Sequence, residues 1–343
     1  MTAAGVPARR ATIREVAEAA GVSRSTASRA LTGHGYVAPD ARDRVRAAAR
    51  ALGYVPDATA RHLRRQASPS IGVLLSDLRN PFYAGLAAGI GQQARRRQYT
   101  MMLADDGGSP ALEAEIAETF VALRVAGVIV TPVSAQVGAY LTGQRIPVIE
   151  VDRQFSAGEC DAVLVDNGSA AERVTARLLA LGHRRIALAT DEMHWTTGRD
   201  RLAGFRAAYA AAGVRLDESL IVTAGWDVGA ARVEIHKLLG RPSPPTAVFA
   251  ANNVLAEAVW RVAAELELSI PDRLSLVSFD DVPWMSMVTP GVTAVAQDTV
   301  ALGEAAVSQL CERILAPSAP ARTVLLSAAV VSRGSTAPPF RLS

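Results

Sequence analysis

Apolar residues recur at helical spacing in the first part of this 343-residue chain. One such stripe, at positions i, i+3, i+4 and i+7, consists of Ile13, Val16, Ala17 and Ala20. This spacing places the four side chains on one face of a helix. Thr12 followed three residues later by Glu15 is a capping box, so we expect the helix to begin just after Thr12.

A second short helix is expected to follow directly. Gly21 interrupts the first pattern, and Ser23 can cap a new helix. The face expected to pack on the first helix holds Thr26, Ala27, Ala30 and Leu31. The opposite, polar face holds Arg24, Ser25, Ser28 and Arg29. Two short helices joined by a glycine turn predict a helix-turn-helix, whose second helix can lie in a DNA major groove.

A third amphipathic segment supplies the apolar surface that two short helices lack. Its stripe is Val45, Ala48, Ala49 and Leu52, and Pro39 stands near its expected start. The pattern alone also fits a small solvated helical subdomain. Charge favours DNA, because residues 1–67 contain twelve arginines and five acidic residues, net +7, whereas the whole chain is +3. A basic head on a mildly acidic body is typical of a phosphate-binding module.

The segments ATIREVAEAAGVSRSTASRAL and GYVAPDARDRVRAAARALGYVPDATARHLRR resemble the DNA-binding head of LacI-type (LacI/GalR family) bacterial transcriptional regulators. The resemblance implies that Arg24 and Ser25, with Arg29 one turn on, read base edges, and arginine suits guanine. The head residues expected to contact DNA are Thr12, Ser23, Arg24, Ser25, Thr26, Ser28 and Arg29. For Thr26 and Ser28 the alternative is phosphate contact or capping, which positions the helix without reading sequence.

The segment DATARHLRRQ, after Pro56, has helix formers but few apolar residues, so it is marginal as an isolated helix. The resemblance implies a hinge helix that folds on DNA and enters the minor groove. Leu63 then wedges between base steps, Ala60 lies where two hinge helices pack, and Arg61 reaches phosphates. The alternative is that Leu63 is an ordinary apolar linker residue.

Short apolar runs alternate with helical stretches from residue 68 onward. The expected strands are SIGVLLSD, YTMMLADD, AGVIVTP, IPVIEVD, AVLVDN, RRIALATD, SLIVTAG, TAVFAAN and RLSLVSFDD. This alternation predicts an α/β fold with parallel sheets, and the number of strands predicts two subdomains. The runs resemble the periplasmic-binding-protein-like body of the LacI type, as far as Thr336, and the ending AAVVSRGST resembles the family's final strand and its Arg-Gly-Ser tail. We expect the chain to cross between the subdomains near Asp152–Ala162, Asp280–Val292 and Pro317–Leu325.

The expected organisation combines an all-α head with this two-lobed body. Residues 1–10 are expected to be a disordered tail, 11–55 the helix-turn-helix domain and 56–67 the hinge helix and linker. Residues 68–336 are expected to form the effector-binding and dimerisation domain, and 337–343 a tail.

Motifs of other functional classes are missing from the sequence. The first expected strand is not followed by G-x-G-x-x-G, and Gly89-Ile90-Gly91 lies inside an expected helix, where it indicates close packing. Neither a P-loop nor G-x-S-x-G nor a His/Cys metal cluster is present. Cys160 and Cys311 lie far apart and are expected to be free thiols of a reducing cytoplasm. We therefore expect neither an enzyme nor a metal or cofactor site.

The sequence contains no run of 18 apolar residues, and residues 1–10 contain no apolar signal core. The expected location is cytoplasmic, at the nucleoid when bound to DNA, and no membrane partner is expected.

Polar residues stand where several expected strands end. They are Asp77, Asn80, Asp152, Asn252, Asp280 and Asp281. Ligands of two-lobed α/β bodies bind at the carboxyl ends of strands, although each of these residues could instead cap a following helix. The resemblance makes Arg201 the effector-binding arginine and places Asp152, Asn252 and Asp280 at effector-contacting positions.

Aromatic side chains can complete such a site as stacking platforms. Phe82 and Trp226 are the expected platforms, and Trp195 and Trp284 fit either this role or core packing. The family more often has the acid before the aromatic residue after that glycine, whereas here Trp226 precedes Asp227. Which of these two side chains enters the cleft stays open.

Carboxylates, an asparagine, an arginine and aromatic faces suit a sugar, and a purine or nucleoside would use the same groups with more stacking. We predict a homodimeric LacI-type repressor that binds a pseudo-palindromic operator under control of a carbohydrate effector. The alternatives are a nucleoside corepressor, an activator of the same fold, and a small-molecule binding module without DNA binding.

Overall fold

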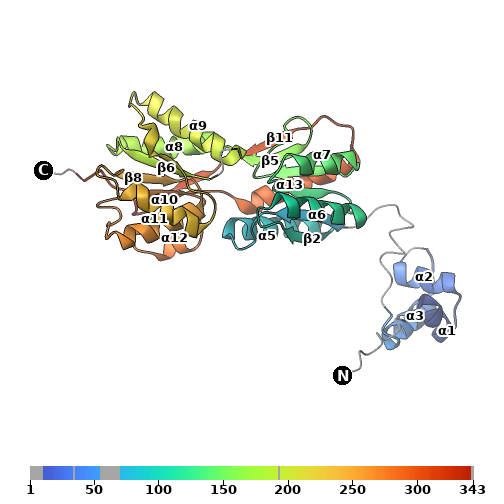
Figure 1. Ribbon diagram of the computed structural model, residues 1–343. Helices are drawn as coiled ribbons and strands as arrows, with labels where there is room; N and C mark the ends of the chain where they lie inside the picture. The colour runs from blue at the N-terminus through green and yellow to red at the C-terminus, as the bar shows by residue number, and fades with distance from the viewer. Residues whose placement is uncertain (1–10, 34, 55–69, 192–193, 341–343) are drawn as a thin grey trace, which may run out of the picture. The chain divides into compact units, whose positions relative to one another are not determined.

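The computed structural model describes residues 11–33, 35–54, 70–191 and 194–340. They belong to two compact units, residues 1–67 and 68–343 (Figure 1). The first unit contains α1 (Ile13–Ala19), α2 (Arg24–Thr32) and α3 (Pro39–Ala51) among its described residues. The predicted tail at 1–10 and the whole of the predicted hinge and linker at 56–67 lie outside the described residues.

The helix starts of the head follow the predicted caps. The Thr12 N–H donates to Glu15 Oε2 at 2.6 Å and the Glu15 N–H donates to Thr12 Oγ1 at 3.4 Å, which confirms the capping box. The Thr26 N–H donates to Ser23 Oγ at 3.1 Å, which confirms the second cap. Gly33 ends α2 with a left-handed φ of 74°, a conformation that favours glycine.

The core of the head is built from small side chains. Its buried members are Val16, Ala17, Ala20, Ala27, Ala30, Val37, Val45 and Ala49. The prediction for Leu52 was wrong, because α3 ends at Ala51 and Leu52 is 42% exposed. Val37, from the segment before α3, is buried in this core instead.

The second unit contains two sheets, each six-stranded in the part of the chain that the structure describes. The first has the order β11 (Thr323–Leu326), β5 (Asp161–Val165), β4 (Val148–Val151), β3 (Val128–Val130), β1 (Ser70–Leu75) and β2 (Thr100–Asp105). The second has the order β12 (Ala329–Val331), β10 (Thr293–Ala296), β9 (Ser275–Phe279), β8 (Ala247–Ala250), β6 (Ile186–Thr190) and β7 (Ile221–Thr223). All pairings are parallel except that of β10 with β12, which confirms the predicted fold class.

Helices cover both faces of each sheet. The first subdomain contains α5 (Pro81–Arg96), α6 (Pro110–Ala122), α7 (Gln136–Gly143) and α13 (Thr299–Leu315). The second contains α8 (Asn167–Ala180), α9 (Thr196–Ala211), the short η1 (Glu218–Leu220), α10 (Val228–Leu239), α11 (Asn253–Glu265) and α12 (Trp284–Met287). Figure 1 shows α8 and α9 on one side of the second sheet and α10, α11 and α12 on the other. In the described part of the chain, no helix is both long enough and apolar enough to span a lipid bilayer.

The glycines of α5 allow a close approach to α13, as the sequence predicted. A Cβ atom at Gly89 would lie 2.9 Å from the Cα of Val300, and one at Gly303 would lie 2.5 Å from the backbone nitrogen of Ile90. The two helices therefore pack nearly backbone against backbone. This contact closes the face of the first sheet that contains Ile71, Val73 and Leu75.

The chain crosses between the subdomains three times in the described residues, and all three predicted crossings were wrong in position. Residues 152–162 connect β4 with β5 in one sheet, and residues 280–292 connect β9 with β10 in the other. The crossings instead follow β5, β10 and β11, near residues 166, 297–298 and 327–328. Strands β10 and β11 were not predicted, so the second and third connections were placed before these strands. The first connection was placed before β5, although β5 itself was predicted.

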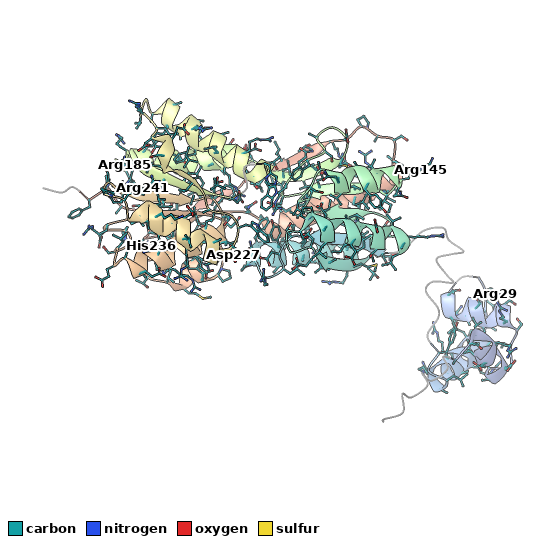
Figure 2. The ribbon with its side chains drawn as sticks, in the orientation of Figure 1. Arg29, Arg145, Arg185, Asp227, His236 and Arg241 are labelled. Carbon is teal, nitrogen blue, oxygen red and sulfur yellow. The ribbon has the colours of Figure 1, made fainter. Side chains whose placement is uncertain are left out.

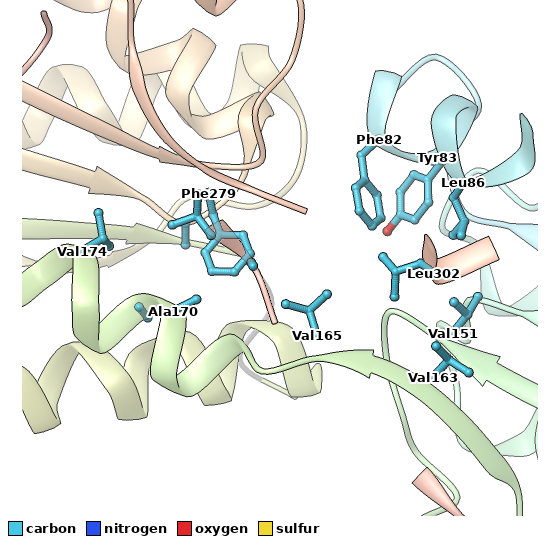
Figure 3. Packing of buried hydrophobic residues seen from close by; sticks show 14 of the residues in the cluster. Phe82, Tyr83, Leu86, Val151, Val163, Val165, Ala170, Val174, Phe279 and Leu302 are labelled. Carbon is cyan, nitrogen blue, oxygen red and sulfur yellow. The ribbon is translucent and has the colours of Figure 1, made fainter. Parts of the chain in front are cut away.

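One buried apolar cluster runs along these crossings from the first subdomain into the second. Figure 3 shows Phe82, Tyr83 and Leu302 on one side and Phe279 on the other, with Val165 between the two groups. The two subdomains thus share a core beside the connecting strands, which places the ends of those strands in a common region.

Candidate functional site

The second helix of the head presents the predicted polar face to solvent. Arg24, Ser25 and Arg29 are exposed, and Ser28 is half-buried. Thr26 is half-buried. Arg29, which is labelled in Figure 2, donates through Nε to the Ser25 carbonyl at 3.4 Å. Ala27 and Ala30 are buried on the opposite side, so α2 has the division of faces that a groove-binding helix requires. Thr12 and Ser23 serve as caps.

The hinge residues predicted to contact DNA, namely Ala60, Arg61 and Leu63, lie outside the described residues. Their roles, like those of the α2 residues, stay predictions.

The structure brings all eight predicted effector residues to one pocket in the body. They are Asp77, Asn80, Phe82, Asp152, Arg201, Trp226, Asn252 and Asp280. The first four come from the first subdomain, after β1, at the start of α5 and after β4. The others come from α9 and from the loops after β7, β8 and β9 in the second subdomain. The pocket is therefore a cleft at the carboxyl ends of strands from both sheets.

Further residues of the cleft were not predicted as site residues. They include Ser76, Tyr83, Arg153, Asp191, Thr197 and Gln297. Asp191 follows β6 directly and carries the same strand-end signal as Asp152, so the sequence could have identified it. Gln297 follows β10, a strand that the sequence analysis missed.

Trp195 and Trp284 were each predicted either to stack on a ligand or to pack in the core. Trp195 lines the cleft. Trp284 is partly buried and packs with Trp260 against the core of the second subdomain, with ring centroids 5.9 Å apart. Asp281, predicted at a strand end, is not in the cleft lining, and its Oδ2 accepts from Arg333 Nη2 at 2.8 Å.

Arg201 is held rigidly at the floor of the cleft. It is 3% exposed, and its guanidinium lies 3.6 Å from the ring centroid of Phe279. Nε donates to Asn167 Oδ1 at 2.8 Å, and Nη1 donates to the Ala251 carbonyl at 2.5 Å. Stacking and two hydrogen bonds fix the plane of the guanidinium.

Arg153 connects the two subdomains by a stacking contact. Its guanidinium lies 3.8 Å from the ring centroid of Trp195, the residue that precedes α9. Nη2 donates to the Tyr83 hydroxyl at 2.5 Å, and that hydroxyl donates to Asp152 Oδ2 at 3.1 Å. The hydrogen-bonded residues Arg153, Tyr83 and Asp152 all belong to the first subdomain. Trp195, which stacks on Arg153, belongs to the second subdomain.

Three buried carboxylates share the cleft, those of Asp152, Asp191 and Asp280. Loss of hydration raises the pKa of each one above its ordinary value, and the nearby Arg201 charge opposes this rise. Asp152 and Asp280 both have a φ of 69°, in the left-handed region that non-glycine residues rarely adopt. The chain thus adopts the same unusual backbone conformation after β4 and after β9, where the carboxylates enter the cleft.

Some buried polar atoms of the lining lack a hydrogen-bond partner within the described residues. They are Asp191 Oδ1, Trp195 Nε1 and Gln297 Oε1. Two are acceptors and one is a donor, and a buried polar group without a partner costs about 1–3 kcal/mol. A ligand with hydroxyl groups can satisfy both kinds of atom at once.

The order of Trp226 and Asp227 is resolved by the structure. Trp226 lines the cleft, whereas Asp227 Oδ1 accepts from the Ala230 N–H at 3.0 Å and caps α10. Figure 2 labels Asp227 beside the junction of the two subdomains. A search of the described residues finds no group of three or more His, Cys, Asp or Glu side chains arranged to hold a metal ion.

Comparison with known proteins relates both units to others. A family model described as bacterial regulatory proteins, lacI family, matches residues 12–57, and one described as a periplasmic binding protein-like domain matches residues 175–336. The ribose operon repressor of Escherichia coli (strain K12) is 30% identical over 328 residues, which are 95% of this chain and 99% of that protein.

Two solved structures extend the similarity to the fold. The transcriptional regulator CelR in complex with cellobiose has 28% identity and a TM-score of 0.72, and the match covers 95% of this chain and 100% of that one. The Lac repressor bound to ONPG in the repressed state has 25% identity and a TM-score of 0.85, with 96% and 100% covered.

Proposed function

This chain belongs to the LacI family of bacterial regulatory proteins and is a DNA-binding transcriptional regulator, and we propose that it is a repressor controlled by a carbohydrate effector. The observation that carries the effector proposal is the set of unpartnered polar atoms in the cleft, Asp191 Oδ1, Trp195 Nε1 and Gln297 Oε1. They lie in a lining that also offers the faces of Phe82 and Trp226. The ribose repressor among the relatives and the cellobiose complex among the solved structures support a sugar.

A sugar fits this set of groups for a physical reason. Each hydroxyl both donates and accepts, so it can satisfy the two acceptors and the indole N–H. The ring carbons of a sugar present C–H groups that pack against an aromatic face. A nucleoside would bring fewer hydroxyls and a larger flat surface, which makes it the weaker fit.

We assign DNA recognition to the exposed face of α2. Arg24 and Arg29 reach solvent from a helix whose other side is buried, and arginine can bind guanine O6 and N7 through two hydrogen bonds. Ser25 lies between them on the same exposed side. The net charge of +7 in residues 1–67 supplies the attraction to phosphates.

The proposed control works by differential binding. An effector in a cleft that both subdomains line changes their relation only if its affinity differs between two arrangements. The resulting arrangement would determine whether two heads of a homodimer can occupy two half-sites together. Two-fold symmetry of such a dimer would impose a pseudo-palindromic operator. Its DNA target places the protein in the cytoplasm.

The test begins with the full-length protein and random duplex DNA. Selection for bound duplexes should return a pseudo-palindrome, and sugars and nucleosides are then screened by thermal shift. The sugar that stabilises the protein should lower operator affinity in a fluorescence-anisotropy titration. Tighter operator binding would instead make it a corepressor, and a nucleoside as the only stabilising ligand would overturn the carbohydrate assignment.

The family consists of DNA-binding regulators, and we propose that the cleft binds its ligand without converting it. The ligand recovered after long incubation with the protein should be unchanged by nuclear magnetic resonance. Appearance of a product would reject this proposal.

A further inference from the structure

We infer that the cleft selects an uncharged or ammonium-bearing polyhydroxy ligand and rejects the carboxylate and phosphate derivatives of the same sugar. The inference rests on the proposed function, because it presumes a sugar in the cleft, and it adds the charge of that sugar. The observation behind it is an excess of carboxylates over guanidinium groups that are free to bind a ligand.

The charged side chains of the lining do not balance. The carboxylates are those of Asp77, Asp152, Asp191 and Asp280, and the guanidinium groups are those of Arg153 and Arg201. The lining therefore has a formal charge of −2, or −1 when Arg79, which pairs with Asp77 at 3.0 Å from outside the lining, is counted. Asp152, Asp191 and Asp280 are 5–6% exposed, so water screens them weakly. A negative ligand would enter a region that is already negative and poorly hydrated.

Arg201 does not offer a free guanidinium to an anion. Its Nε and Nη1 already donate to Asn167 and to the Ala251 carbonyl, and one face is covered by Phe279. Among the described residues only Nη2 is left without a hydrogen-bond partner. Its positive charge acts on Asp152, Asp191 and Asp280 together, so it offsets carboxylates that are already present.

All three guanidinium nitrogens of Arg153 lie close to polar groups of the protein. Nη1 donates to Ser76 Oγ at 3.4 Å and Nη2 donates to the Tyr83 hydroxyl, while Nε lies 3.7 Å from Asp152 Oδ2. Trp195 covers one face of the guanidinium. A bidentate contact with a carboxylate or phosphate needs two free N–H groups on one edge, and Arg153 has no such edge.

Helix N-termini do not reverse this balance. The Asn80 and Asn252 side chains accept hydrogen bonds from the Phe82 and Leu255 amides, which caps α5 and α11. α9 has no side-chain cap at Trp195 and is the remaining anion-favouring start at the cleft within the described residues. Its dipole is equivalent to about +0.5 charge, which is smaller than the net negative charge of the side chains even when the Arg79–Asp77 pair is counted.

A neutral or cationic polyol matches the same groups well. Asp191 Oδ1 and Gln297 Oε1 need donors, which hydroxyl and ammonium groups supply. An ammonium group would also reduce the repulsion among the three buried carboxylates. The ligand class is thus a free aldose, a polyol or an amino sugar.

The decisive experiment is isothermal titration of the full-length protein with matched ligands. One set is D-glucose, D-glucosamine, D-gluconate and D-glucose 6-phosphate, and the other is D-ribose and D-ribose 5-phosphate. In whichever set binds, the neutral or amino form should bind at least tenfold more tightly than the anionic form. An acid or phosphate that binds as tightly as its neutral parent overturns the inference and leaves the carbohydrate proposal standing. Failure of every sugar, both in these sets and in the thermal-shift screen, overturns both.

A variant tests the electrostatic cause. Asp191→Asn removes one carboxylate at nearly constant volume, so the ratio of anion to neutral affinity should rise several-fold. Asp272→Asn makes the same chemical change at an exposed residue outside the cleft lining and should leave the ratio unchanged. Equal ratios in both variants would reject charge as the cause. The ligand series on the unmodified protein decides the main question even if the Asp191 variant does not fold.

Discussion

The indole ring of Trp226 lies directly against the backbone of Gly108. A Cβ atom at Gly108 would lie 2.6 Å from both Cζ2 and Cη2 of that ring, which is closer than a carbon contact allows. Trp226 belongs to the loop between β7 and α10, and Gly108 to the loop between β2 and α6. The contact therefore joins the two subdomains beside the cleft, and only a residue without a side chain permits it.

Gly108→Ala should weaken effector binding. The added methyl group displaces Trp226, and the left-handed φ of 75° adds backbone strain of about 1–2 kcal/mol. Gly107→Ala is the matched control, because Gly107 has a φ of 57° but no atom near its Cβ position. Both variants should lose similar stability in urea unfolding, and only Gly108→Ala should lose effector affinity by calorimetry. Equal affinities in the two variants would show that the Trp226 contact is irrelevant to binding.

Arg201→Ala should abolish the effector response while operator binding is retained. The change removes the buried charge that offsets three carboxylates, and loss of such a buried partner costs about 3–5 kcal/mol. Arg199→Ala is the control, because Arg199 is exposed on the same helix and pairs with Asp200. Operator affinity with and without sugar, measured by anisotropy, tests the prediction. A normal sugar response in Arg201→Ala would move the effector site elsewhere.

Arg24→Ala should relax the base preference at one position of each half-site, at a cost of about 1–3 kcal/mol. The reason is loss of a two-bond contact to one base, with the phosphate contacts retained. Affinities for operators with each base at that position provide the measurement. A uniform loss across all four sequences would make Arg24 a phosphate contact.

Asp106 should make the protein less stable as the pH rises from about 4 to 8. Burial raises the pKa of this carboxyl to about 7, above its ordinary 3.8, so the folded state binds the proton more tightly than the unfolded state. The stabilisation is then present at low pH and lost as the pH passes 7. Asp106→Asn keeps the Oδ1 that accepts from the Gly108 N–H, and it should flatten this dependence. Urea unfolding midpoints at pH 5 and pH 8 are compared, and the same decrease in both proteins would contradict the assignment.

The first two helices of the head could be predicted from the sequence, because the residues that define them lie close together in the chain. The stripe from Ile13 to Ala20, the Thr12–Glu15 box and the Ser23 cap depend on residues within one or two helical turns. The prediction failed at Leu52, where burial depends on what else packs against α3, and Val37 was buried there instead.

Part of the cleft lining could also be predicted from the sequence, because strand ends can be recognised locally. Carboxyl ends of parallel strands meet at one edge, so Asp77, Asp152, Asn252 and Asp280 could be grouped from their positions at the ends of predicted strands, with support from the family resemblance. Gln297 was not predicted, because the strand that it follows, β10, was not among the predicted strands. Two of the three crossings were misplaced for the same reason, whereas the first was placed before β5, a strand that was predicted.

The linear pattern also says nothing of contacts between residues far apart in the chain. Trp195 over Arg153, Trp226 against Gly108, and the engagement of both arginines by Asn167, Tyr83 and backbone carbonyls arise only when the two sheets come together. Sequence periodicity therefore determined the elements and the face of the DNA-binding helix. The folded arrangement determined which side chains are free to meet a ligand, because a hydrogen-bonding group already used by a distant partner is no longer available.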